Sequence, residues 1–151
     1  STKIATTAFV TNAATGPKTA KVFANTTSVT VSNGTLLSGT IPTSTYTTGD
    51  MGEVEASFLS ANTNSISMSL NGVQIWSWTA SSQVAVITTT TFWVTSSTAA
   101  SFVYIIAPSG LATIVGKVDL TGLNFATNQT LATATASSFN VTAYALLCRK
   151  L

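Results

Sequence analysis

Residues 65–78 read SISMSLNGVQIWSW, and this stretch decides the fold. Apolar and hydroxyl side chains alternate on both sides of Asn71-Gly72, the dipeptide that best supplies the two positive φ angles of a type I′ hairpin turn. A two-residue turn sets the pairing of its strands. The predicted pairs are Leu70 with Val73, Met68 with Ile75, and Ile66 with Ser77. Alternation then predicts a buried core face made of Ile66, Met68, Leu70, Val73 and Ile75.

The opposite face of this hairpin is predicted to carry two indoles, Trp76 and Trp78, together with Gln74 and several serines. One interpretation is an aromatic platform that stacks on a sugar ring while Gln74 hydrogen-bonds its hydroxyls. The other is that the indoles are covered by another strand, by the N-terminal segment or by a neighbouring subunit, since aromatic residues are also enriched at interfaces. Both interpretations stay open at this point.

Period-2 alternation and turn residues continue along the rest of the chain, without a convincing helical period. Asn33-Gly34 is interpreted as a turn between two strands, and a run of four threonines, Thr88–Thr91, as part of a strand. Eight or more short strands with regular turns are typical of a sandwich or barrel. The predicted strands are 20–24, 28–32, 35–41, 53–60, 64–70, 73–79, 83–95, 101–107, 111–119, 128–135 and 139–148.

Composition supports strands and argues against several functions. The 151 residues include 30 Thr and 19 Ser, while only 7% are charged, against about 25% in an ordinary domain. Without any histidine, catalytic triads, histidine metal sites and histidine pH switches are excluded, so we expect no enzyme and no cofactor. The six basic residues form no stripe or run, so nucleic acid is not an expected partner.

The chain length predicts one domain of ordinary size. No apolar run approaches the ~18 residues of a membrane-spanning helix, and the first ten residues lack the apolar core of a secretory signal. We therefore expect no membrane partner, and a complete small protein. Residues 1–20, which include the turn-like NAATGPK at 12–18, are predicted to be an N-terminal arm, and 21–151 a single β-sandwich domain.

Three of the four acids lie close together, at Asp50, Glu53 and Glu55. Oxygen ligands of this kind suit Ca²⁺, but DMGEVE is not a calcium-loop pattern. We therefore predict no metal site, and an exposed strand edge with solubilising charges instead. Cys148, the only cysteine, is predicted to be a small packed side chain, because no histidine could activate it.

Two stretches carry a resemblance to a known group. They are TLLSGTIPTSTYTTGDMGEVEASF (35–58), followed by the hairpin on Asn71-Gly72, and QTLATATASSFNVTAYALLCRKL (129–151). Together they resemble a jelly-roll-like β-sandwich domain of tailed-bacteriophage virion surface proteins, which occurs in capsid decoration, head-fibre and tail-fibre proteins. The resemblance implies a virion surface location and a homotrimer. The chain departs from this group in its low charge.

Low charge also has a physical meaning of its own. A monomer with so few charges is poorly protected against edge pairing, so we expect a protein that assembles. The first functional hypothesis is a capsid decoration protein that binds the major capsid protein or another virion protein, with Lys3, Lys18 and Lys21 as its capsid anchor. The second is a tail- or head-fibre module that recognises a host surface glycan through Trp76, Trp78 and Gln74. The lack of a long stalk in 151 residues favours decoration.

Overall fold

A computed structural model describes residues 20–151, which form an all-β sandwich. The predicted all-β, jelly-roll-like antiparallel sandwich is confirmed. Of the predicted N-terminal arm, residues 1–19 lie outside the described residues, and Ala20 already belongs to the first strand. The strands are β1 (Ala20–Asn25), β2 (Val29–Ile41), β3 (Met51–Ser60), β4 (Asn64–Leu70), β5 (Val73–Ala80), β6 (Val84–Ser96), β7 (Ala99–Pro108), β8 (Ile114–Leu120) and β9 (Gln129–Lys150).

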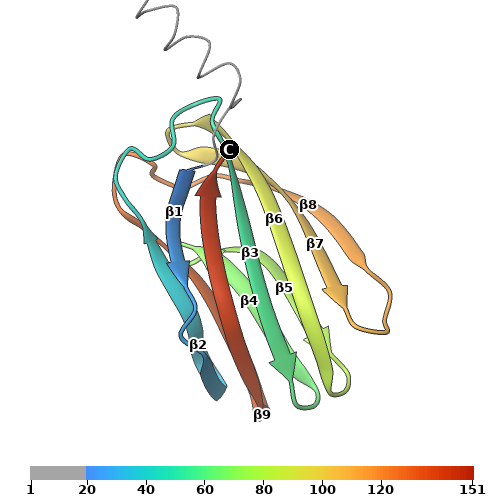
Figure 1. The fold of residues 1–151 in the computed structure, drawn as a ribbon. Coiled ribbons are helices and arrows are strands. Elements are labelled where there is room, and N and C mark those ends of the chain that lie inside the picture. The colour runs from blue at the N-terminus through green and yellow to red at the C-terminus, as the bar shows by residue number, and fades with distance from the viewer. Residues whose placement is uncertain (1–19) are drawn as a thin grey trace, which may run out of the picture.

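The last strand, β9, belongs to both layers of the sandwich. Its first half pairs with β4 on one side and with the second half of β2 on the other. Its second half pairs with β3 on one side and with β1 and the start of β2 on the other. Beyond β3 the sheet continues through β6 and β7 to β8, whereas β5 ends the other layer (Figure 1).

The predicted turn at Asn33-Gly34 is wrong, because both residues lie inside β2. The register against β9 shifts between Val31 and Asn33, and Gly34 has a φ of 120°. A bulge bends a strand, and glycine tolerates such a φ without strain. The two predicted strands 28–32 and 35–41 are therefore one bent strand, and 128–135 and 139–148 are likewise one strand, β9.

The hairpin of β4 and β5 has the predicted turn but only part of the predicted register. Asn71 and Gly72 have φ angles of 48° and 77°, and Leu70 faces Val73 as predicted. Ser69 then faces Gln74 while Met68 faces Trp76, so Ile75 is an extra residue in β5. An extra residue turns every later side chain to the other face. The predicted pairs of Met68 with Ile75 and of Ile66 with Ser77 are therefore wrong.

The predicted core face is largely confirmed. Ile66, Met68, Leu70 and Ile75 are buried, and Val73 is half-buried against the core. The four threonines lie in β6 as predicted, and Thr88 and Thr90 point into the sandwich. Buried hydroxyls need partners, and that of Thr133 donates to the Leu37 carbonyl oxygen at 2.9 Å and accepts from the Leu37 amide at 3.1 Å. These two hydrogen bonds lie at a second bulge in β2, between Thr35 and Ser38.

Leu70→Ala tests this core. The side chain is 1% exposed, so its removal leaves a cavity and is expected to lower the free energy of unfolding by about 2–5 kcal/mol. Gln74→Ala, on the exposed face of the same hairpin, is the matched control and is expected to stay within about 0.5 kcal/mol of the parent. Urea denaturation measures both. Equal effects of the two substitutions would contradict the assignment of the core face.

Candidate interaction surface

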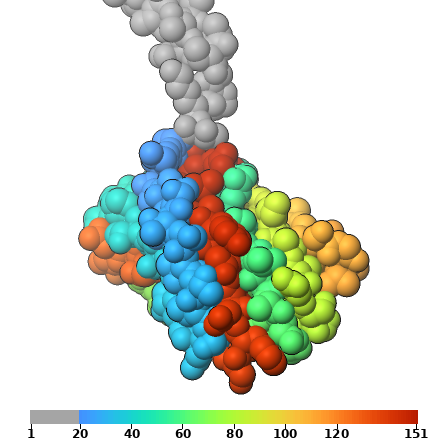
Figure 2. Space-filling view, turned by 60° about the horizontal axis from the view of Figure 1, so that its bottom comes forward, coloured from blue at the N-terminus to red at the C-terminus, as the bar shows by residue number. Residues whose placement is uncertain are grey.

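The outward side of the layer formed by β1, β9, β3, β6, β7 and β8 is a broad and regular surface (Figure 2). We call it the outer face. Antiparallel register aligns its side chains in rows across the strands. One row runs Leu147, Glu55, Thr89, Ile105 and Val115, and the next runs Arg149, Glu53, Thr91, Val103 and Lys117. Six of these ten side chains are aliphatic or threonine, and the other four are charged.

The acidic residues of the outer face are neutralised within it. The Arg149 guanidinium lies 2.9 Å from a Glu55 carboxylate oxygen and 3.9 Å from one of Glu53. These residues are in adjacent strands, because β3 lies between β6 and β9. The prediction that Glu53 and Glu55 lie on a strand edge is therefore wrong, since β3 is an inner strand. What the sequence did not reveal was the partner, which lies 94 residues away from Glu55.

Asp50 closes the loop before β3. Its carboxylate accepts hydrogen bonds from the Thr47 amide at 2.9 Å and the Thr47 hydroxyl at 3.1 Å, and it lies 3.0 Å from the Lys150 ammonium. The Thr47 amide and then Lys150 lower the pKa of Asp50 below its usual range. Within residues 20–151, no group of three His, Cys, Asp or Glu side chains is placed to hold a metal ion.

Asp119 on β8 is the fourth acid. It accepts a hydrogen bond from the Ser101 hydroxyl at 2.6 Å and lies 3.3 Å from the Lys117 ammonium. The Ser101 hydroxyl and then Lys117 lower the pKa of Asp119. Every acidic side chain of the chain thus lies within 4 Å of a basic group.

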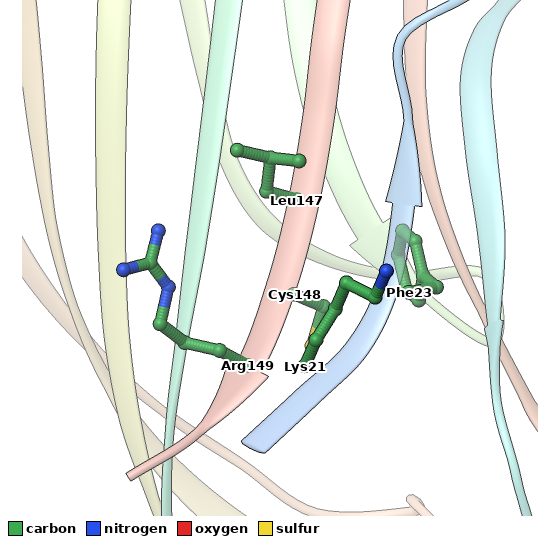
Figure 3. Close-up of a pocket in the computed structure, with 5 residues that line it drawn as sticks. All are labelled: Lys21, Phe23, Leu147, Cys148 and Arg149. Carbon is green, nitrogen blue, oxygen red and sulfur yellow. The ribbon is translucent and has the colours of Figure 1, made fainter. Parts of the chain in front are cut away.

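Two shallow hollows flank Leu147 on the outer face. One, of 250 Å³, lies between β1 and β9 and is lined by Lys21, Phe23, Leu147, Cys148 and Arg149 (Figure 3). In Figure 3 the cationic ends of Lys21 and Arg149 point away from each other, so they do not converge on one ligand. The other hollow, of 230 Å³, is lined by Glu55, Ala56, Ser57, Ile87, Thr89, Ala145 and Leu147. Neither hollow gathers the convergent polar groups that typify a small-molecule site.

Below the outer face, Tyr46 and Cys148 form a buried polar contact. The Tyr46 hydroxyl donates to the Arg149 carbonyl oxygen at 2.9 Å and lies 3.4 Å from the Cys148 sulfur. Burial raises the pKa of the Cys148 thiol to about 11. Burial, and then Cys148 and Asp50, raise the pKa of Tyr46 above its usual value. A neutral buried thiol is a poor nucleophile, so Cys148 fits the predicted packed role.

The residues predicted to contact a glycan or subunit are not brought together on a surface. Trp76 is only 2% exposed, and its Nε1 donates to the Thr90 hydroxyl at 3.2 Å. Trp78 is half-buried against the core, while Gln74 is exposed. The extra residue Ile75 explains the difference, because it turns both indoles inward. Of the two interpretations left open, the structure therefore supports coverage by another strand for Trp76, which lies against β6, and not an exposed platform of both indoles.

Of the three lysines predicted to anchor the chain, Lys21 is exposed on β1. Lys3 and Lys18 lie outside the described residues. Lys21 faces Arg149 across β1 and β9, so the described part of the predicted anchor borders the outer face. Residues 20–151 contain no helix that is long and apolar enough to cross a membrane.

No protein-family model matches the chain, and no curated protein matches its sequence. Among solved structures it is similar to the crystal structure of the alginate lyase from Klebsiella pneumoniae, with a TM-score of 0.38 and 9% sequence identity. The match covers 66% of this chain and 60% of the lyase, so this chain spans less than two thirds of that neighbour's length. A likeness this distant says nothing about activity.

The shifted pKa values predict how stability depends on pH. Asp50 and Asp119 have lower pKa values when folded than the unfolded value of about 3.9, so their stabilisation is complete above about pH 5 and is lost as pH falls through the folded values. Cys148 has a raised pKa when folded. Its stabilisation is therefore complete below the unfolded value of about 8.5 and is lost as pH rises toward about 11.

Urea denaturation across pH is thus expected to show a plateau between about pH 5 and about pH 8. In Cys148→Ala the alkaline decline is expected to begin later, near the ordinary tyrosine pKa of about 10. Tyr46 is then the remaining described group whose pKa is raised by folding. An alkaline decline that begins at the same pH in both proteins would show that the thiol is not its cause.

Proposed function

We propose that this chain is a structural protein of a bacteriophage virion, a decoration protein on the head surface that acts by binding other proteins. The resemblance noted in residues 35–58 and 129–151 supports the virion role. The observation that carries a binding role is the outer face, where aliphatic and threonine side chains surround carboxylates that are already paired with basic groups.

The physical support lies in the cost of removing water. Covering an unpaired charge is expensive, whereas a paired charge and an aliphatic surface can be covered at lower cost. Ile87, which lines the second hollow of the outer face, is 63% exposed and becomes favourable to bury once a partner is present. A protein shell offers such a partner over a broad, flat area, which suits this face better than a small ligand does.

The burial of Trp76 bears on the alternative function. Glycan recognition by a fibre module was expected to use Trp76, Trp78 and Gln74 together, and only Gln74 is fully exposed. The decoration role needs none of these side chains at the surface. It also needs no catalytic group, and we propose that the chain is not an enzyme.

Immunogold electron microscopy of purified phage particles tests the virion role. The expected result is labelling of the heads. Labelling of fibre tips would favour the receptor-binding alternative, and a protein absent from purified particles would refute the virion role altogether.

Ile87→Asp tests the outer face as the surface that attaches to the shell. The substitution puts an unpaired charge where the shell would cover it, so co-sedimentation with particles that lack the native protein is expected to fall at least tenfold. Phe139→Asp is the matched control, since Phe139 is an exposed apolar residue at the bend of β9 rather than in the rows of the outer face. Equal binding by both variants would rule out the outer face as the attachment surface.

A second variant tests the predicted anchor lysines. Lys3→Ala, Lys18→Ala and Lys21→Ala are combined in one full-length chain. If the lysines bind acidic groups on the shell, attachment should weaken, and the native protein's attachment should weaken with added salt. Far-ultraviolet circular dichroism checks that the sandwich remains folded. Unchanged attachment of a folded triple variant would exclude these lysines as the anchor.

A further inference from the structure

The strand β8 lies at the rim of the outer layer and pairs only with β7 within residues 20–151 (Figures 1 and 2). β5 approaches it without pairing. The free side of an edge strand presents backbone N–H and C=O groups that can pair with another strand. Within the described part of the chain, the edge of β8 is therefore open to one more strand.

This edge lacks most features that prevent strand pairing. Its sequence, IVGKVDL, has no proline, and its register with β7 contains no bulge. Val115 is 66% exposed, and both its partner on β7, Ile105, and the adjacent Ile114 are exposed as well. Exposed apolar residues along a regular edge are typical of a surface that another chain covers.

The charges of β8 favour a second copy of the same strand as the partner, and they favour one register of pairing. Lys117 and Asp119 are two residues apart and so lie on the same face. When two identical edges pair antiparallel around a two-fold axis normal to the sheet, one residue of β8 faces itself. An axis at Val118 places Lys117 opposite the partner copy's Asp119, and Asp119 opposite the partner copy's Lys117. Opposite charges in directly opposed positions stabilise a strand pair.

The other registers lack this match. An axis at Lys117 sets two lysines against each other, and an axis at Asp119 sets two aspartates against each other, which is unfavourable. An axis at Gly116 places Lys117 opposite the partner copy's Val115, so Lys117 has no opposite charge across the axis. Only the register centred on Val118 opposes the opposite charges.

We propose that β8 is a self-pairing edge, at which a second copy of this chain adds its own β8 antiparallel around a two-fold axis at Val118. The outer layer then continues from one copy into the other. The proposal goes beyond the virion role and does not depend on it. It is also distinct from the trimer that the resemblance implies, because a three-fold axis cannot relate two antiparallel copies of one strand.

Charge reversal tests the pairing in solution. Lys117→Asp sets aspartates opposite Asp119 at two places, so the dimer dissociation constant measured by analytical ultracentrifugation should rise about tenfold or more at low salt. The double variant Lys117→Asp with Asp119→Lys restores opposite charges across the axis and should bring the constant back toward the native value. A native protein that is monomeric at high micromolar concentration, or a dimer that Lys117→Asp leaves unchanged, would overturn the proposal.

Cysteine cross-linking tests the register. Val118→Cys places a thiol opposite its own copy, within reach of a disulfide, while the native Cys148 is buried. Mild oxidation should link Val118→Cys into covalent dimers faster than the control Lys117→Cys, whose copies lie diagonally apart. Equal rates would overturn the register.

The mass in solution distinguishes this contact from the implied trimer. A hexamer that falls to trimers in Lys117→Asp supports two-fold pairing between trimers. A trimer that is insensitive to Lys117→Asp overturns pairing through β8 and leaves the virion role to be judged by microscopy.

Discussion

The structure depends on one strand that both layers share. β9 runs from Gln129 to Lys150, and its backbone groups pair with β2 and β4 in its first half and with β1, β2 and β3 in its second. A strand buried between neighbours on both sides must satisfy its hydrogen bonds in both layers at once. The bends in β2 and β9 follow from this requirement, because each strand has to pass from one layer to the other.

The end of the same strand also supplies the basic partners of three of the four acidic residues. Arg149 and Lys150 at the end of β9 lie beside Glu55, Glu53 and Asp50, which begin or precede β3. Half-exposed pairs of this kind add little to stability individually. Their effect is instead on the outer face, where the carboxylates are already paired with basic groups. The edge strand β8 belongs to the same layer, so both of the contacts that we propose involve one sheet.

Bulges explain which of the predictions made from side-chain alternation are correct and which are wrong. A bulge adds one residue, and with a side-chain period of two it exchanges the faces of everything that follows. Before Ile75 the alternation in the hairpin is read correctly, and after it Trp76 changes from an expected surface residue to a core residue bonded to Thr90. The bulge in β2 likewise made Asn33-Gly34 resemble a turn. Asparagine and glycine suit positive φ angles both in a hairpin turn and in a bulge, so the Asn-Gly dipeptide does not distinguish a turn from a bulge.

The sequence by itself determined the local features of this protein: the all-β class, the turn at Asn71-Gly72, the burial of Leu70 and Met68, and the strand that contains the threonine run. Each follows from alternation and turn preference within about ten residues. Only the tertiary structure decided the pairing of Arg149 with Glu55, the burial of Trp76 and the position of β8 at the rim. These depend on which strands become neighbours, and alternation specifies the faces of a strand without specifying its partners.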